Sequence, residues 1–517
     1  MTDQARLRRP ADLDWTLGAL VERRAAEHGG RVALRSGDGV TVSFADLAAR
    51  VGGVRTLLAD RGLRAGERVG LMMANTLAFP IAWLGVASAG MAAVPVNKRS
   101  GPRDARYVLD HSGTRLVLVD HTTRDLVTAA LDAVDRSVAV EVITGDGWPD
   151  AAATPPVDVT AAALANVQYT SGTTGFPKGC MLSHRYWQQM GQGAVDLLRL
   201  TADDVLLTAQ PFSYIDPLWN TVAALRAGAE LVVLDGFHPS TFMRDVARFG
   251  VTVVYCLATM PVLLLRQPPA AHDRDHRLAR VSCSAIPPEL HAQLERRWGV
   301  PWYEVYGMTE TGLNIGVLDD EHDELVGSGS MGGVLAHCEA RVVDADGVDV
   351  ADGHEGELLL RGLGMMDGYV DDPEATAGFF AGGWAHTGDL VVRDEAGRFT
   401  LRGRRKDMIR RAGENVAAAE VEATLVTHPA VLECAVLAVP DDMAGEELRA
   451  VVVTTADASP TARELHSYVA GRLARFKVPR YWEFRDALPH TPSERVAKHR
   501  IGPPNGDLID LSRRAPA

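Results

Sequence analysis

The segment YTSGTTGFPKG, residues 169–179, leads from an apolar run into a loop of small and hydroxyl residues and then to a single lysine. The run LANVQY (164–169) reads as a strand, and the loop after it is too polar and too permissive in its backbone for a core segment. Glycines let backbone amides approach a ligand, hydroxyl groups donate hydrogen bonds, and Lys178 adds a positive charge. The loop differs from the Walker A order GxxxxGK[ST]. It still indicates a phosphate-binding site, with a solvent-exposed turn as the simpler interpretation.

Short β-branched runs alternate with helical patterns over the first 310 residues. RVGLMMAN (68–75) precedes a helical pattern over 76–89, and LVVLD (231–235) precedes another over 239–249. Further predicted strands lie at 252–256, 280–284 and 302–307. This alternation predicts βαβ units and mostly parallel sheets.

The pattern changes beyond residue 327, where short strands are separated by Gly and Asp turns. This pattern predicts a small β-barrel or an antiparallel sheet. After Arg404 we expect a helix near 416–428, two strands and a helix near 461–476, which together make an α+β domain of roughly 110 residues. The predicted fold is therefore α/β, with a large N-terminal domain of two βα-type sheets plus a small β-barrel, and a smaller α+β C-terminal domain.

Composition excludes several classes of protein. The chain has 517 residues and a net charge of −14, which argues against nucleic-acid binding. The N-terminus lacks the apolar core of a signal peptide, and prolines and glycines interrupt the apolar run 79–96, so we expect no membrane span. The five cysteines are scattered without CxxC pairs, as in a cytoplasmic protein with reduced thiols and no cysteine metal site.

Five more motifs follow the phosphate loop at widely separated positions. They are VYGMTE (305–310), GEL (356–358) with GY (368–369), WAHTGD (384–389), GRRKDMIRRAG (403–413) and EVE (420–422). In this order they resemble the motifs of the adenylate-forming superfamily, which contains acyl-CoA synthetases, adenylation domains of nonribosomal peptide synthetases and firefly luciferase. The resemblance covers essentially the whole chain and is greatest for a stand-alone acyl-CoA ligase.

The resemblance implies a role for individual residues. Tyr306 would lie near adenine, Thr309 would contact the α-phosphate, and Glu310 would hold Mg²⁺, a hard cation that prefers carboxylate oxygen. Asp389 would accept both ribose hydroxyls, with Arg404 reaching the same sugar. The remaining nucleotide-binding positions are Thr170, Ser171, Gly172, Thr173, Thr174, Gly175, Ser284, Ala285 and Gly307. Taken alone, Asp389 is equally compatible with capping a turn, and Arg404 with a solvated basic face.

The resemblance also implies a reaction and a division of the chain. Residues 1–403 would form the N-terminal adenylation domain, 404–406 a hinge containing Lys406, and 407–517 a mobile C-terminal domain. An acid would react with ATP to give an acyl-adenylate and pyrophosphate. The C-terminal domain would then rotate, and a thiol, usually that of CoA, would attack.

The end of the chain departs from the family pattern. Family members carry PxTxxGK, whose lysine contacts the acid's carboxylate and the α-phosphate. The present chain reads PHTPSERVAK (489–498), with Glu494 in place of the glycine and Arg495 in place of the lysine. Arginine keeps the charge in a longer, planar group, so the exchange is not conservative. We favour Lys498 as the catalytic lysine over Arg495. In a third interpretation, Lys498 and Arg495 are both solvent-facing charges, and adenylation depends on Lys178 and Mg²⁺.

The acid pocket is expected around QPFSYIDPLW (210–219), with Met308 on another side. Tyr214 occupies the position of a gating histidine in many acyl-CoA synthetases, and Trp219 would line the pocket. A carboxylate at Asp216 would favour a cationic or amine-bearing acid. The alternative places Asp216 at the start of a helix with Pro217 at its first position. SCSAIP (282–287) replaces a glycine-rich family stretch against adenine.

Three functions fit these observations. The first is an acid–CoA ligase for a small aryl, amino-bearing or cationic acid. The second keeps the adenylation but loads a carrier protein, or activates nitrite for an aromatic amine as a diazotase does in secondary metabolism. The third is a nucleotide-binding protein with degraded catalysis, which the retention of Glu310 disfavours. The oligomeric state is open, with a homodimer as one option.

Overall fold

The computed structural model describes residues 13–132, 134, 137–143, 155–170, 177–257, 260–411, 414–441, 445–456, 458–490, 496–504 and 508–511. Most of the phosphate loop (171–176) and Arg495 lie outside these residues, as does the side chain of Lys406.

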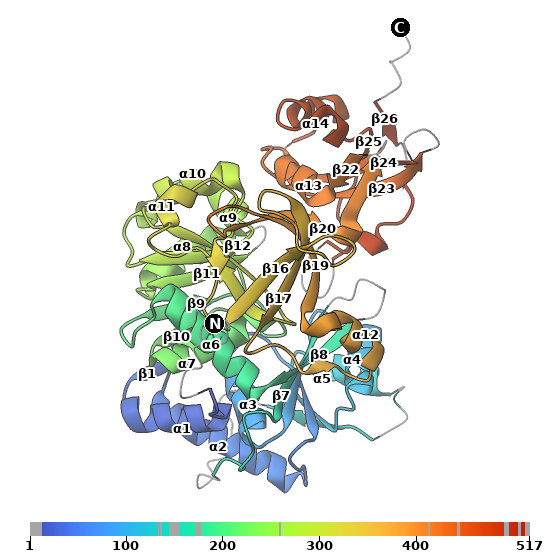
Figure 1. Ribbon diagram of the computed structural model, residues 1–517. Coiled ribbons are helices and arrows are strands. Elements are labelled where there is room, and N and C mark those ends of the chain that lie inside the picture. Colours follow the sequence, from blue (N-terminus) through green and yellow to red (C-terminus); the bar gives the residue numbers. More distant parts are fainter. Residues whose placement is uncertain are drawn as a thin grey trace, which may run out of the picture.

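Two mostly parallel sheets form the body of the N-terminal domain, as the alternating pattern predicted (Figure 1). The nine-stranded sheet has the order β15-β14-β13-β12-β11-β9-β10-β1-β2 and is parallel from β13 to β1. Its strands are β1 (Val32–Ser36), β2 (Thr41–Ser43), β9 (Val205–Thr208), β10 (Glu230–Val233), β11 (Val253–Leu257), β12 (Arg280–Ser284), β13 (Trp302–Met308), β14 (Gly312–Gly316) and β15 (Gly333–Val334).

The seven-stranded sheet has the order β18-β8-β7-β4-β3-β5-β6 and is parallel from β7 to β6. Two antiparallel strands, β8 and β18, continue it on the side of the phosphate loop. Its strands are β3 (Arg68–Met72), β4 (Ala92–Pro95), β5 (Leu116–Val119), β6 (Ala139–Val142), β7 (Leu164–Thr170), β8 (Lys178–Ser183) and β18 (Gly368–Tyr369).

The helices of the N-terminal domain follow the strands in sequence. They are α1 (Leu17–His28), α2 (Phe44–Asp60), α3 (Ala78–Ser88), α4 (Pro102–His111), α5 (Arg124–Leu131), α6 (His184–Leu198), α7 (Ile215–Ala227), α8 (Pro239–Arg248), α9 (Met260–Leu265), α10 (Pro288–Trp298), α11 (His322–Leu325) and α12 (Pro373–Phe379). Local sequence sets their ends: Ser43 and Asp46 form a capping box on α2, and Gly228 ends α7 in the left-handed conformation.

The apolar run 79–96 is part of the protein core. It forms α3 and β4, and every residue of α3 from Phe79 to Ser88 is buried, with Trp83 completely enclosed. Helices α1 and α2 pack against α3. Among the described residues, no helix is both long enough and apolar enough to cross a membrane.

A four-stranded sheet occupies the region where a small barrel was expected. Its order is β16-β17-β19-β20, and all three neighbouring pairs are antiparallel. The antiparallel arrangement confirms the prediction, but the barrel is wrong for the described residues, because the edge strands β16 and β20 are not paired with each other. The strands are β16 (Cys338–Val343), β17 (Glu355–Gly362), β19 (Ala385–Arg393) and β20 (Phe399–Arg404).

The C-terminal domain is a separate α+β unit at the top of Figure 1. Its strands are β21 (Met408–Arg411), β22 (Glu414–Ala417), β23 (Val431–Asp441), β24 (Gly445–Thr454), β25 (Tyr481–Phe484) and β26 (Ile509–Asp510), and its helices are α13 (Ala418–Val426) and α14 (Ala462–Ala470). The short 3₁₀ turn Arg405–Asp407 connects β20 to β21. The expected hinge 404–406 therefore coincides with the end of β20 and this turn.

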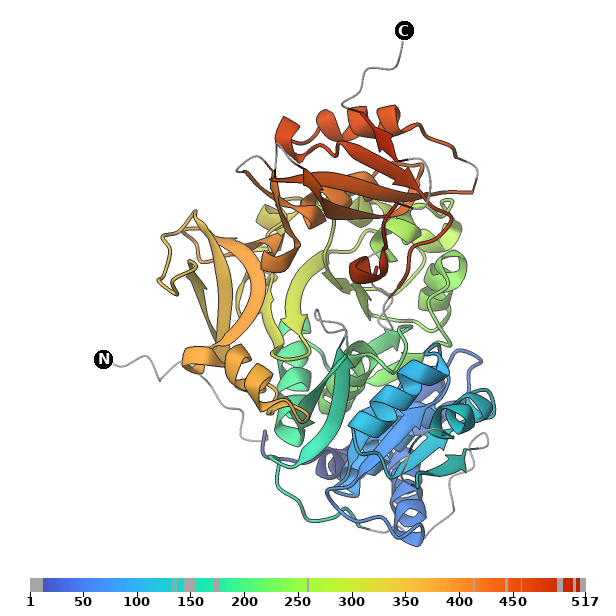
Figure 2. The same cartoon turned by 90° about the vertical axis from the view of Figure 1, so that its right-hand side faces the viewer.

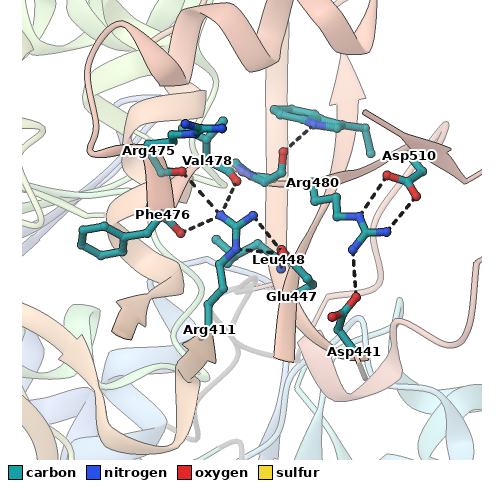
Figure 3. A network of polar contacts seen from close by, with 11 residues as sticks. Arg411, Asp441, Glu447, Leu448, Arg475, Phe476, Val478, Arg480 and Asp510 are labelled. Carbon is teal, nitrogen blue, oxygen red and sulfur yellow. Dashed lines mark hydrogen bonds and ion pairs between the residues drawn. The ribbon is translucent and has the colours of Figure 1, made fainter. Parts of the chain in front are cut away.

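Two arginines tie the C-terminal domain together (Figure 3). Arg411 donates to the Glu447 carboxylate at 2.9 Å and to the carbonyl oxygens of Phe476 at 2.8 Å and Val478 at 3.1 Å. Arg480 donates to both oxygens of Asp510 at 3.0 Å. These contacts fix the loop before β25 and the chain's last strand to the sheet.

One arginine of the N-terminal domain reaches the C-terminal domain, which lies across the end of the N-terminal domain in Figure 2. Arg266 follows α9 and donates to the carbonyl oxygen of Val426, the last residue of α13, at 3.4 Å, and also to that of Val431. It therefore satisfies one carbonyl group that the end of α13 leaves without a helical partner, and a second at the start of β23.

Candidate active site

Three residues far apart in the sequence meet at Asp389. In the β19–β20 pair, Asp389 lies directly opposite Arg404, whose Nε is 2.9 Å from Asp389 Oδ1. The hydroxyl of Tyr306, on β13, donates to Asp389 Oδ2 at 2.6 Å. Asp389 is only 4% exposed. Because a carboxylate has about four lone-pair sites, it can accept these bonds and still accept from a diol.

Glu310 is buried in the turn that follows β13. Tyr369 and Cys180 lie beside its carboxylate. The Tyr369 hydroxyl donates to Glu310 Oε1 at 3.2 Å, and burial and the nearby Glu310 carboxylate raise the pKa of the Cys180 thiol on β8. Thr309, beside it, is partly exposed. A buried carboxylate with one oxygen fixed by a hydroxyl is a fitting ligand for Mg²⁺. The structure therefore has a suitable residue for the expected metal at Glu310.

Lys178 is the first residue of β8 and pairs with Thr170 at the end of β7. The loop between them, with Ser171, Gly172, Thr173, Thr174 and Gly175, lies outside the described residues. The Lys178 ammonium is 3.6 Å from Asp372 Oδ2 and 4.9 Å above the centre of the Tyr369 ring. The lysine is thus held beside Tyr369 and, through it, near Glu310.

The expected adenine stretch is a strained turn supported by an unpredicted residue. Ala285 has a φ of +68°, a conformation that non-glycine residues rarely adopt. Glu304 on β13 accepts the backbone N–H groups of Ala285 at 2.6 Å and Ile286 at 2.7 Å. Burial raises the pKa of Glu304 to about 8, against the lowering effect of these two bonds. The sequence signal for Glu304 was an acid within the otherwise apolar strand WYEVYG.

Glycine is required at position 307. A Cβ there would lie 2.4 Å from the carbonyl oxygen of Gly312 in the neighbouring strand β14. Close packing against β14 therefore explains the glycine at position 307, in addition to its expected role in nucleotide binding. Ser284 is anchored nearby, where its hydroxyl donates to the Val305 carbonyl at 3.0 Å and lies 3.0 Å from the Tyr255 hydroxyl.

The expected acid-pocket residues come mainly from the start of α7. Tyr214 is the residue before the helix, and its hydroxyl accepts from the side chain of Asn97 at 3.2 Å. The helix begins at Ile215, so the alternative with Pro217 at the first position is wrong by two residues. Asp216 still lies in the first turn, where a negative charge is favourable.

Asp216 contacts the aromatic side chain of Trp219. The Trp219 indole donates to Asp216 Oδ1 at 3.4 Å, and its ring meets the Tyr255 ring edge-on at 5.1 Å. Burial raises the pKa of Tyr186 well above its ordinary value, and the nearby Cys180, Glu310 and Asp216 side chains raise it further. Asp216 and Glu310 therefore lie in one neighbourhood around Tyr186. Met308 is partly buried and packs against the cluster that contains Ile315 and Tyr306.

The expected catalytic lysine of the C-terminal domain is held within that domain. Lys498 begins a short 3₁₀ turn, and its ammonium is 2.7 Å from Glu422 Oε1 of α13. Burial raises the pKa of Glu422, and the charge of Lys498 partly offsets this. No described contact joins Lys498 to Glu310 or Asp389.

Known proteins resemble this chain in sequence and in fold. Residues 21–370 match the family model of the AMP-binding enzymes, and residues 420–495 match the model of the AMP-binding enzyme C-terminal domain. The chain is 34% identical over 500 residues to a sulfoacetate–CoA ligase of Cupriavidus necator, with 94% of this chain and 97% of the relative covered. It is 30% identical over 483 residues to a crotonobetaine/carnitine–CoA ligase of Escherichia coli, with 89% and 92% covered.

A solved structure supports the same assignment. The crystal structure of ATP-bound MatB from Rhodopseudomonas palustris superposes with a TM-score of 0.82 at 30% identity, with 94% of this chain and 98% of that chain covered. The chain belongs to the AMP-binding enzyme family, and it is an adenylate-forming ligase of the acyl-CoA ligase type. The resemblance inferred from the motifs is confirmed.

Proposed function

We propose that this protein activates a small carboxylic acid bearing a positively charged ammonium group, and transfers the acyl group to CoA. The observation that carries this choice is the partly buried Asp216 carboxylate beside the Trp219–Tyr255 ring pair. Aromatic faces and a carboxylate together are what binds an alkylammonium group. Of the acids that the sequence suggested, the cationic and amino-bearing ones are therefore favoured over a plain aryl acid.

The charge of Asp216 should favour the substrate of one of the two named relatives over that of the other. A sulfonate would bring a second negative charge toward Asp216, whereas a trimethylammonium group would bring an opposite one. Two unit charges about 5 Å apart interact by roughly 3 kcal/mol at an effective dielectric constant of 20. One relative is named for a cationic acid and another, at higher identity, for an anionic one, so the choice rests on Asp216 and not on the relatives.

The proposed reaction uses the described residues as follows. Asp389 and Arg404 hold the ribose, and the turn at Ala285 lies along the adenine. Lys178 neutralises charge on the phosphates, and Mg²⁺ bound at Glu310 would supply further positive charge there. The acid's carboxylate oxygen attacks the α-phosphorus and pyrophosphate leaves. The CoA thiol then attacks the acyl carbon, and AMP leaves.

The proposal is tested by acid preference in wild type and in Asp216→Asn. The probes are 4-(trimethylammonio)butyrate, its uncharged isostere 5,5-dimethylhexanoate, and sulfoacetate. We expect wild type to show the highest kcat/KM for the ammonium acid, and Asp216→Asn to reduce the preference over the isostere by about 10-fold or more. The exposed Asp196, which accepts from Gln192 on the outside of α6, provides the control Asp196→Asn. A wild-type preference for sulfoacetate, or an unchanged ratio in Asp216→Asn, would contradict the proposal.

A further inference from the structure

Tyr369 lies between the two groups expected to act on the phosphates of ATP. It belongs to the two-residue strand β18, which pairs antiparallel with β8 so that Tyr369 lies opposite Cys180. Lys178 is two residues before Cys180, and side chains two residues apart share a face of a strand. The pairing therefore brings Tyr369 to the face that carries both Lys178 and Cys180.

The two ends of the Tyr369 side chain have different partners. Its hydroxyl donates to Glu310 Oε1 at 3.2 Å, while its ring lies 4.9 Å from the Lys178 ammonium. Tyr369 and Glu310 are each 9% exposed, so little water competes with these contacts. One side chain thus contacts both the candidate metal ligand and the candidate phosphate-binding lysine.

The ring of Tyr369 is held from behind. Its backbone N–H donates to Thr376 Oγ1 at 2.9 Å, and its ring meets the Phe379 ring edge-on at 6.0 Å. Gly368 has a φ of +135°, and a Cβ there would lie 2.7 Å from Thr376 Cγ2. The loop and helix α12 therefore fix the orientation of the tyrosine, as pre-organisation of a site requires.

We propose that Tyr369 is a positioning residue for the magnesium–nucleotide complex. Its hydroxyl fixes Glu310 Oε1 and thereby the orientation of the carboxylate toward the metal, and its ring holds the ammonium of Lys178 toward the phosphates. Partners behind a ligand commonly set metal affinity in this way. The inference rests on the nucleotide half of the proposed function and is independent of which acid is used.

Removing the hydroxyl alone tests the first half of this role. ATP binding to the full chain is titrated by calorimetry at a series of Mg²⁺ concentrations, without any acid. Tyr369→Phe keeps the ring, so we expect the Mg²⁺ concentration for half-maximal ATP binding to rise about 3- to 10-fold. ATP affinity at saturating Mg²⁺ should stay within about 2-fold of wild type, because Lys178 keeps its ring contact.

Removing the ring tests the second half. Tyr369→Leu should raise the Mg²⁺ requirement as Tyr369→Phe does, and should weaken ATP binding at saturating Mg²⁺ by a further 3- to 10-fold or so. Tyr303 gives a matched control, because it is also a buried tyrosine on a strand, and burial and the nearby Asp319 carboxylate raise its pKa. Tyr303→Phe should leave the Mg²⁺ dependence unchanged.

The outcomes separate positioning from packing. A shifted Mg²⁺ dependence in Tyr369→Phe with a melting temperature close to that of Tyr303→Phe supports the inference. Wild-type Mg²⁺ dependence in Tyr369→Phe would overturn it, as would equal shifts in Tyr369→Phe and Tyr303→Phe. If wild type does not prefer the ammonium acid but Tyr369→Phe still shifts the Mg²⁺ dependence, only the assignment of the acid is contradicted. The two results are independent because the calorimetry contains no acid.

Discussion

The nucleotide side of the site and its C-terminal side are built differently. In the N-terminal domain, Arg404 and Tyr306 each donate directly to Asp389 at the expected ribose site. In the C-terminal domain, Lys498 bonds a residue of its own domain, Glu422. The first group is in place before any ligand arrives, whereas Lys498, in the catalytic role we propose for it, would have to leave a 2.7 Å ion pair to reach an acid's carboxylate.

The difference follows from what each side has to do. Nucleotide is held through both half-reactions, so its site can be pre-organised on adjacent strands at no cost to turnover. In the reaction that we propose, a lysine on a rotating C-terminal domain would act in only one half-reaction. An internal partner such as Glu422 keeps its charge compensated for the rest of the cycle.

Breaking the pre-organised side should have the largest effect. Asp389→Ala leaves Arg404 and the Tyr306 hydroxyl without their shared partner and removes the expected ribose acceptor. We expect ATP affinity, measured by calorimetry, to fall about 500-fold, which corresponds to roughly 3–4 kcal/mol. Asp394→Asn, in the exposed turn that follows β19, is the control and should bind ATP as wild type does. Less than a 5-fold loss in Asp389→Ala would remove Asp389 from the ribose site.

Breaking the C-terminal side should impair the chemical step and spare nucleotide binding. Lys498→Ala should lower acid-dependent pyrophosphate release about 100-fold, with ATP affinity nearly unchanged. Arg495→Ala should have a much smaller effect. Near-wild-type rates for both variants would mean that no charge from this end of the chain takes part in adenylation.

The pair His322–Glu295 lies outside both regions. Its loss should lower stability and leave ATP binding unchanged, which makes it a useful contrast to them. Hydrogen bonds to Glu295 and Asp323 raise the pKa of His322. Burial alone would raise the pKa of Glu295, but bonds from His291, His322 and the Trp302 amide lower it to about 2. His322 therefore stabilises the fold fully below its unfolded pKa of about 6.5, and this contribution is lost as pH rises through its higher folded value.

The substitution that tests this pair is His322→Gln. It should lower the free energy of unfolding by roughly 1–3 kcal/mol at pH 6 and by less at pH 9, as measured by denaturant titration. ATP affinity should not change. A loss of stability that is equal at both pH values would show that His322 contributes by packing and not by charge.

Sequence patterns predicted the two mostly parallel sheets and the α+β C-terminal domain, and the helices expected at 76–89, 239–249, 416–428 and 461–476 correspond to α3, α8, α13 and α14. They did so because alternating β-branched runs and turn residues are local signals. The motifs also identified Asp389, Arg404 and Tyr306, whose meeting the structure shows. The barrel was wrong because closure depends on whether two edge strands meet, which no local pattern records.

Other residues could not be found from spacing. Glu304 and Tyr369 act on residues 18 or more positions away, so their roles appear only once the strands are paired. The Lys498–Glu422 pair joins the end of the chain to α13 across the C-terminal domain. In contrast, Asp216 was visible in the sequence as a charge in an apolar stretch, but its contact with Trp219 needed the helix that begins at Ile215.

Product formation tests the central claim most directly. Purified protein with ATP and Mg²⁺ is incubated with 4-(trimethylammonio)butyrate, with uncharged and anionic acids, and with nitrite plus an aromatic amine, each with and without CoA. AMP, pyrophosphate and acyl-CoA are then quantified. We predict pyrophosphate release that depends on the ammonium acid and rises with CoA, with acyl-CoA formed in equal amount to AMP. Pyrophosphate release only with nitrite and an amine, or with no acid at all, would contradict the account.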